Sequence, residues 1–249
     1  MSQTSPTPAG ALAPGKLADF FRYYDGGNAH HRLAVAILEK ALPAPLFTQA
    51  SQWVVEYRKG RSAPTGEVKL PVEYLRQGDS AVPGQGPRMC FSSSNAMLVN
   101  WLKPNALGAS GQKDDQYLQR VFVYGDTTDA AAQLRALRHF GLDATFKSNM
   151  DWDDVDAQLA RRVPVPIGIL HHGTADHPTG GGHWILVIGR SADGKSYLVH
   201  DPAGELDLVH GGHGLGKSGK SVWYSRANLG RRWMVDGPAT GWGIWVSAS

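Results

Sequence analysis

Hydrophobic residues follow two different periods along the chain, a helical one in the first half and a shorter, strand-like one in the second. Residues 90–103 (CFSSSNAMLVNWLK) place Met97, Leu98 and Trp101 along one helical stripe, and Pro104 marks the end of that pattern. The sequence therefore predicts a helix that begins near residue 90.

Two further helices are predicted downstream. Residues 125–146 (GDTTDAAAQLRALRHFGLDATF) contain Thr and Asp capping candidates, a helical run to about His139, and Gly141 as a stop before a strand. Residues 149–163 (NMDWDDVDAQLARRV) have an acidic first turn and two arginines in the last turn, as the helix dipole favours.

Short apolar runs bounded by Gly, Pro and Asp predict strands. They are 69–75 (KLPVEYL), which alternates, and the more continuous runs 163–170 (VPVPIGIL), 183–189 (HWILVIG) and 196–202 (SYLVHDP). An Asp-Gly pair between the last two runs predicts that they form a hairpin.

The same patterns divide the chain into four parts. Residues 1–15, rich in Pro, Ala, Ser and Thr, have too few large apolar groups to fold and predict a flexible tail. Residues 16–58 predict a small helical module, and residues 59–69 a linker. Residues 70–249 form the main domain, where helices come first and strands second, the order of an α+β fold.

Composition and charge narrow the class of protein. Hydrophobic residues make up 42% of the 249 residues and charged residues 19%, which is typical of a globular protein. No apolar run reaches the roughly 20 residues of a membrane span, so we expect no membrane insertion. The first residues lack the charged and apolar regions of a signal peptide, so we expect synthesis in the cytoplasm without one.

The formal net charge of +3 comes from the front of the chain. Residues 1–61 hold seven Lys or Arg against four Asp or Glu, whereas the remainder holds equal numbers of each. This surplus suits either a solvated basic face or attraction to an anionic polymer such as cell-wall material. Because the main domain has no surplus, we expect no nucleic-acid partner.

Cys90 is the only cysteine, which excludes an internal disulfide. It stands at the start of a predicted helix, where unpaired N–H groups and the helix dipole favour a thiolate. A thiolate can act as a nucleophile if a base holds its proton and a third group orients that base. The alternative is a small buried hydrophobe, which is how most free cysteines behave.

The candidate base is His183, which follows three glycines at the mouth of a predicted strand. Asp201 lies 18 residues later, at the end of the next strand, and is the candidate orienting group because a hairpin brings these two positions to one edge. A strict two-residue turn would place Asp201 on the wrong face, so a longer turn or a β-bulge is required. A strand-edge histidine and a turn-forming aspartate are the structural alternatives.

Acyl transfer also needs hydrogen-bond donors for the oxyanion, commonly a side-chain amide upstream of the nucleophile. Gln77, at the end of a predicted strand, is the preferred candidate. Gln85, in a Gly-flanked loop nearer to Cys90, is the other, and both also suit ordinary surface amides.

Gln, Cys, His and Asp thus occur in the order and local contexts of papain-like cysteine peptidases. The chain resembles the branch that includes bacteriocin-processing, double-glycine leader peptidases, especially the versions encoded by bacteriophages. The matching stretches are RMCFSSSNAMLVNWLKP, DDQYL, GDTTD, GGHWILVIGR and HDPAGE, and the resemblance covers about residues 70 to 210.

The resemblance implies a papain-like fold, with N-terminal helices and an antiparallel sheet, here extended by a small helical N-terminal module. It also implies thiol hydrolysis of an amide bond, with Cys90 as nucleophile, His183 as base and Asp201 as orienting acid. The glutamine departs from the pattern, because neither Gln77 nor Gln85 stands at the distance from the cysteine that leader peptidases use.

These observations predict a cysteine peptidase with a peptide or peptidoglycan substrate. Its closest functional fit is a phage-type endolysin that degrades the bacterial cell wall, after release by other means or as part of a virion. The alternatives are a protein-processing cysteine protease and a non-catalytic virion or cell-wall-binding protein on the same fold. The sequence predicts no particular oligomeric state.

The main chemical alternative is a metal site. His171, His172, His177 and His183 form a loose cluster of possible zinc ligands, but their spacing matches no metal motif. They lie in a stretch that predicts a flexible loop, so we expect solvent exposure or a place in the substrate cleft, and no metal or cofactor. The Trp- and Arg-rich residues 224–245 suit equally a binding face and an edge of the core.

Overall fold

The structure is a computed structural model that describes residues 36–37, 40–43, 66–108, 111–214 and 216–247. The chain divides into two compact units, residues 1–62 and 63–249, and the fold below is that of the second unit. The predicted tail, most of the predicted helical module and most of the predicted linker lie outside the described residues.

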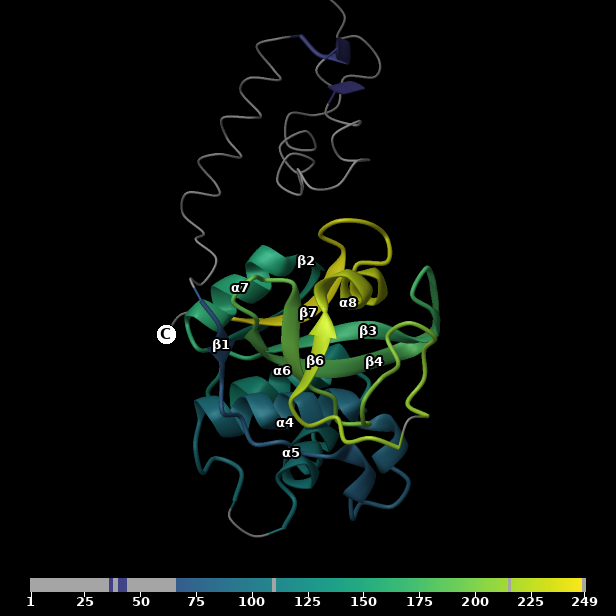
Figure 1. The fold of residues 1–249 in the computed structure, drawn as a ribbon. Helices are drawn as coiled ribbons and strands as arrows, with labels where there is room; N and C mark the ends of the chain where they lie inside the picture. Colours follow the sequence, from purple (N-terminus) through teal and green to yellow (C-terminus); the bar gives the residue numbers. More distant parts are fainter. Residues whose placement is uncertain (1–35, 38–39, 44–65, 109–110, 215, 248–249) are drawn as a thin grey trace, which may run out of the picture. The chain divides into compact units, whose positions relative to one another are not determined.

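A seven-stranded sheet forms the centre of the second unit (Figure 1). The strand order is β2-β7-β3-β4-β5-β6, β1 pairs with the end of β4, and all pairings are antiparallel. The strands are β1 (Val68–Lys69), β2 (Ala144–Met150), β3 (Val165–Thr174), β4 (His177–Arg190), β5 (Ser196–His200), β6 (Val222–Ser225) and β7 (Gly241–Val246).

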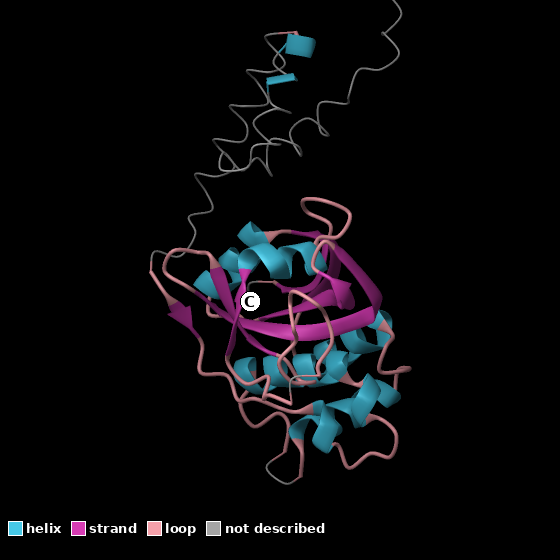
Figure 2. Cartoon of the chain, turned by 45° about the vertical axis from the view of Figure 1, so that its right-hand side comes forward, coloured by secondary structure: helices cyan, strands magenta, loops and turns pink. Residues whose placement is uncertain are grey.

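Helices cover both faces of this sheet (Figure 2). One side carries α4, α5 and α6, and the other carries α7 and α8. Their bounds are α4 (Cys90–Leu102), α5 (Lys113–Phe122), α6 (Ala130–His139), α7 (Trp152–Ala160) and α8 (Arg226–Trp233), with short 3-10 helices η1 (Gln77–Asp79) and η2 (Gly86–Arg88). The predicted α+β class is therefore confirmed.

The predicted helices form, although Arg161 and Arg162 follow α7 and do not lie in its last turn as predicted. α4 begins at Cys90 and ends two residues before Pro104. The α7 helix begins with a capping box in which the Asp151 side chain accepts from the Asp154 N–H and the Asp154 side chain accepts from the Asp151 N–H. Within the described part of the chain, no helix is both long enough and apolar enough to span a membrane.

The strand predicted over residues 69–75 is wrong beyond Lys69. Pro71 has no N–H to donate to a neighbouring strand, and the N–H of Val72 turns back to the carbonyl of Leu70 at 2.8 Å. This segment therefore leaves the sheet after the bond from the Leu70 N–H to the carbonyl of Ile188.

The flexible loop predicted around the histidine cluster is also wrong. Residues 171–174 extend β3 and residues 177–182 extend β4, so the two strands form one long hairpin. The loop was predicted because this stretch lacks the apolar pattern of a strand. Strands pair through backbone N–H and C=O groups, however, and these do not require apolar side chains. The buried Arg232 of α8 reinforces the hairpin, because its guanidinium donates to the carbonyls of Leu170, His172 and Gly173.

The Trp- and Arg-rich residues 224–245 mostly complete the core. They include α8 and most of β7, and β7 lies between β2 and β3 inside the sheet. Trp233 is buried, and its indole N–H donates to the carbonyl of Trp242 at 2.8 Å. The Trp242 side chain, by contrast, is 55% exposed and lies at the surface.

Candidate active site

The lone cysteine occupies the first position of α4. Cys90 is half-buried, whereas the nine residues that follow it in the helix are buried. Met89, the residue before the helix, provides no side-chain cap for the N–H groups of the first turn. The positive end of the helix dipole therefore lies at the thiol, as the sequence predicted.

An aromatic stack joins the helix that carries Cys90 to the strand that carries His183. Phe91 and Trp184 stack with ring centroids 3.6 Å apart and planes within 2° of parallel. A Cβ at Gly168 of β3 would lie 3.2 Å from the indole of Trp184, so the glycine leaves room for this ring. Because Phe91 follows Cys90 and Trp184 follows His183, the stack brings the thiol and the imidazole together.

A register shift in the β4–β5 hairpin places Asp201 on the same side as His183. Leu186 pairs with His200, but Gly189 pairs with Leu198, so one extra residue of β4 is accommodated between these pairs. This shift confirms the irregularity that the sequence required. Asp201 follows directly after β5, on the face that His183 shares.

His183 and Asp201 form a buried pair. The distance from His183 Nε2 to Asp201 Oδ1 is 2.7 Å, and the two residues are 4% and 0% exposed. The His183 side chain also hydrogen-bonds to Cys90, and because Nε2 is engaged, Nδ1 is the ring nitrogen left for the sulfur. The backbone N–H of Trp184 adds a second hydrogen bond to the thiol. The structure thus brings the three predicted residues together.

Further donors hold the Asp201 carboxylate. Its Oδ1 also accepts from the backbone N–H of Ala203 at 3.1 Å. Its Oδ2 accepts from the Tyr224 hydroxyl at 3.1 Å and lies 3.3 Å from His213 Nε2. The Tyr74 hydroxyl donates to the Asp201 backbone carbonyl at 2.9 Å. A carboxylate with this many partners has a fixed orientation.

The three groups shift one another's pKa values in the directions that an ion pair requires. Burial raises the pKa of the Cys90 thiol, but the charge and hydrogen bond of His183 outweigh it and the net pKa is lowered. Burial lowers the pKa of His183, yet the Asp201 and Cys90 charges raise it overall. Burial raises the pKa of Asp201, and His183 lowers it overall. A thiolate–imidazolium pair is therefore favoured.

Both candidate glutamines lie in the segment that leads to Cys90. Gln77 is buried in η1, its Nε2 donates to the carbonyl of Gly86 at 2.8 Å, and its backbone N–H donates to Pro202. Gln77 therefore lies between the turn before Cys90 and the residue after Asp201. Gln85 is half-buried and directly precedes η2.

One detail of the histidine prediction is wrong. His183 lies in the interior of the long strand β4 and not at its mouth, because the preceding glycines continue the strand. The β5 strand pairs with β4 only from Leu186 to Arg190 and so ends before it reaches His183. Asp201, the residue that follows β5, therefore lies beside the His183 imidazole.

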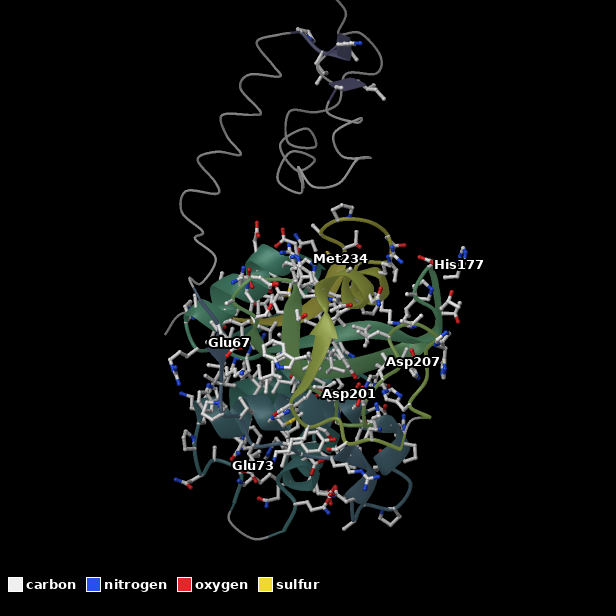
Figure 3. The ribbon with its side chains drawn as sticks, in the orientation of Figure 1. Glu67, Glu73, His177, Asp201, Asp207 and Met234 are labelled. Carbon is white, nitrogen blue, oxygen red and sulfur yellow. The ribbon has the colours of Figure 1, made fainter. Side chains whose placement is uncertain are left out.

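The other histidines are distributed around the hairpin. His171 and His172 have ring centroids 4.0 Å apart, and the His171 ring lies 5.4 Å from that of His183. His177 is exposed at the end of the hairpin, well away from Asp201 (Figure 3). His177 therefore does not belong to the group of histidines near His183.

Sequence reasoning missed His213 and Tyr224, which both contact the Asp201 carboxylate. A usable signal for His213 existed, because the triplet Gly-Gly-His occurs at 181–183 and again at 211–213. No comparable sequence signal identified Tyr224, because it is one of many aromatic residues in the C-terminal part of the chain.

Comparisons with solved structures include two matches of low sequence identity. The chain resembles a solved structure described as a putative C39-like peptidase from Bacillus anthracis, with 13% identity and a TM-score of 0.47, over 74% of this chain and 98% of that one. It also resembles Xylellain, a cysteine protease from Xylella fastidiosa, with 13% identity and a TM-score of 0.39, over 76% and 87%. No curated protein matches significantly.

A family model gives the more specific match. Residues 69–208 match the family described as papain-like cysteine protease AvrRpt2. That range is more than half of the chain, and it contains the thiol, the imidazole and the carboxylate that the fold brings together. The protein therefore belongs to this family of papain-like cysteine proteases.

Proposed function

We propose that the protein hydrolyses a peptide bond with Cys90 as the nucleophile, His183 as the general base and acid, and Asp201 as the group that orients His183. The observation that carries this proposal is the bridging position of His183. Its Nε2 lies 2.7 Å from Asp201 Oδ1, and its other nitrogen faces the half-buried thiol. Both neighbours therefore act on one imidazole ring.

The arrangement supports a two-step reaction. The Cys90 thiolate attacks the carbonyl carbon, and the His183 imidazolium gives its Nδ1 proton to the leaving amine, which departs as a thioester forms. Water then attacks the thioester, His183 takes a proton from that water, and the thiolate leaves. The backbone N–H of Cys90 and the side-chain amide of Gln77 are the proposed donors for the oxyanion. The Gln77 amide nitrogen donates one proton to the carbonyl of Gly86 and keeps a second proton for the oxyanion.

For the substrate, we favour a peptide bond in a polypeptide, because the matching family is described as a protease. A second candidate is a peptide bond in bacterial peptidoglycan. Two observations support it: the resemblance to phage-encoded leader peptidases, and the basic surplus of residues 1–61, which suits an anionic cell wall. In that case the protein would act at the wall after release by other means or as part of a virion.

The test of the chemistry compares wild type with Cys90→Ala, which removes the only thiol of the chain. Both proteins are incubated with a peptide library derived from a bacterial proteome, and new termini are read by mass spectrometry. Wild type should cleave, and Cys90→Ala should lose at least about a thousandfold in rate because it lacks the nucleophile. Cleavage by Cys90→Ala at the wild-type rate would exclude thiol catalysis.

A second assay separates the substrate classes. Purified peptidoglycan is treated with the same two proteins, and the released fragments are identified by mass spectrometry. Thiol-dependent fragments from peptidoglycan with none from the peptide library would favour the lysin. The reverse result would favour a protein-processing protease. Binding to walls with no cleavage of either substrate would leave a non-catalytic binding protein on the same fold.

A further inference from the structure

A second histidine faces the carboxylate of the proposed catalytic pair. His183 Nε2 lies 2.7 Å from Asp201 Oδ1, and His213 Nε2 lies 3.3 Å from Oδ2 of the same carboxylate. The centroids of the two imidazole rings are 4.7 Å apart. The two nitrogens and a carboxylate oxygen all lie within 4.8 Å of one another.

The loop that carries His213 is held in place by the β3–β4 hairpin. The Gly212 N–H donates to the carbonyl of His171 at 2.7 Å, and the Ala175 N–H donates to Val209 at 2.8 Å. From α8, Arg232 donates to Leu208 of the same loop at 2.9 Å as well as to the hairpin. His213 is therefore positioned before any ligand arrives.

We propose that His183, Asp201 and His213 form a binding site for a divalent transition-metal ion, with Zn²⁺ as the best fit, and that the bound ion switches the peptidase off. The second half of this proposal rests on the proposed function. The first half is a statement about metal binding alone and can be tested in a protein with no activity.

The donor set suits zinc better than the common hard cations. Two imidazole nitrogens and one carboxylate oxygen are ordinary zinc ligands, and three protein ligands leave a fourth position for water. Mg²⁺ and Ca²⁺ prefer an all-oxygen shell and would not choose two imidazoles. Asp201 is fully buried, whereas the His213 side chain is 17% exposed, so the ion can enter along the His213 side.

A third imidazole lies beside the proposed site. It belongs to His171, whose ring centroid lies 5.4 Å from that of His183 and 5.6 Å from that of His213. The Nδ1 atom of His171 is buried and has no hydrogen-bond partner within the described residues. A nitrogen of the type that zinc binds is therefore unused next to the proposed ligands.

The bound ion would stop catalysis by occupying the nitrogen that Asp201 now orients. Binding to Nε2 of His183 displaces the proton there, which leaves to solvent, and the remaining ring proton sits on Nδ1 facing Cys90. A metal-bound imidazole holds that proton more tightly than an imidazolium does. His183 could then neither protonate the leaving amine nor accept a proton from the attacking water.

The first experiment measures Zn²⁺ binding calorimetrically on the full chain with Cys90→Ala. This background separates the proposed site from a simple thiol–imidazole site, which would need Cys90. We expect one Zn²⁺ per chain and no binding of Mg²⁺. Adding His213→Gln, which keeps a hydrogen-bond donor but removes the imidazole, should weaken binding at least ~10-fold. Adding His210→Gln, an exposed histidine of the same loop, should leave binding unchanged.

Two outcomes of that experiment would overturn the site: absence of Zn²⁺ binding in Cys90→Ala, or equal affinity with and without His213→Gln. A Co²⁺ spectrum of wild type provides a measurement that does not depend on the folding of a variant. The visible bands of a low-coordinate Co²⁺ ion without a thiolate charge-transfer band support the site, and a thiolate band overturns it.

The switch is tested separately on the wild-type protein. Zn²⁺ should abolish peptidase activity with a midpoint near its measured dissociation constant, and a chelator should restore the activity. Zn²⁺ binding without inhibition would overturn the switch and leave the metal site. If wild type cleaves no substrate, the proposed function fails, and the calorimetric result still decides whether the site exists.

Discussion

Asp201 controls the charge of the proposed catalytic histidine. The negative charge of Asp201 raises the pKa of His183 more than any other neighbouring group does, against the burial that lowers it. Four donors surround its two carboxylate oxygens, from His183, Ala203, His213 and Tyr224. The protonation of His183 therefore depends on a carboxylate whose own position is fixed.

The pH dependence of activity follows from these directions. Because the thiol pKa is lowered and the imidazole pKa is raised to about 10, the reactive ion pair exists between the lowered thiol pKa and about pH 10. Activity is lost below that range when the thiolate is protonated and above it when the imidazolium loses its proton. A plot of kcat/KM against pH should be a bell whose alkaline limb lies well above the ordinary pKa of histidine.

Asp201→Asn should move the alkaline limb of that bell to lower pH. Without the carboxylate charge, the pKa of His183 falls, and opposite charges at this distance change a pKa by about 1 to 3 units. The rate of Cys90 labelling by iodoacetamide should show the same change without any substrate. An unchanged alkaline limb in both measurements would mean that Asp201 does not control His183.

We expect alanine substitutions of the two glutamines to have different effects on kcat. Gln77→Ala should lower kcat by about 10²–10³, the usual cost of removing one oxyanion donor, with little change in KM. Gln85→Ala is the matched control from the same segment and should stay within a few-fold of wild type. If Gln85→Ala carries the loss and Gln77→Ala does not, then the amide nearer to Cys90 is the oxyanion donor.

At the scale of secondary structure, the site depends on the contact between α4 and β4. The stacked rings of Phe91 and Trp184 lie one residue after the thiol and one residue after the imidazole. Both rings are largely buried, so few other positions are open to them. The distance between Cys90 and His183 is thus set by packing and not by the catalytic side chains themselves.

Phe91→Ala should therefore weaken both the fold and the site. Truncation of a buried phenylalanine typically lowers the free energy of unfolding by about 3–5 kcal/mol, measured by denaturant titration. Phe122→Ala, at a 38% exposed phenylalanine of α5, is the control and should change it by only about 0.5 kcal/mol. In the folded fraction of Phe91→Ala, Cys90 labelling should approach that of a free thiol. Wild-type labelling there would show that the stack does not set the site.

Much of this arrangement could be predicted because local rules determine it. The start of α4 at Cys90 followed from the apolar stripe and Pro104, and the irregularity in the β4–β5 hairpin followed from the alternation of side chains between His183 and Asp201. In each case the residues concerned are close in sequence, so turn geometry and period suffice.

The parts of the fold and the site that could not be predicted depend on partners that are distant in sequence. The interior strand β7 pairs with β2 and β3 from the far end of the chain, and no local pattern identifies it as part of the same sheet. The place of His213 is likewise set by backbone hydrogen bonds from its loop to the β3–β4 hairpin. The α5 helix was not predicted from its sequence, which mixes charged, polar and apolar residues. In the structure this helix buries Tyr117 and Leu118.

At the scale of the whole molecule, the chemistry and the charge surplus lie in different units. Cys90, His183, Asp201 and Gln77 all belong to residues 63–249, which also contain the hydrophobic core. The basic surplus lies in residues 1–61, and the rest of the chain carries no net charge with histidine neutral. If the chain uses long-range attraction to an anionic surface, that attraction comes from the first unit.

Deletion of residues 1–62 should separate these two properties. The remaining unit keeps every residue of the proposed site, so kcat/KM on a soluble peptide should stay within about twofold of wild type, since an unchanged barrier means an unchanged rate. Sedimentation with purified bacterial cell walls should fall at low ionic strength, and the difference from wild type should disappear at about 1 M salt, where the screening length is about 3 Å. Loss of peptide cleavage in a folded truncated protein would show that residues 1–62 contribute to the site. Equal sedimentation of both proteins at every salt concentration would show that the basic surplus does not bind the wall.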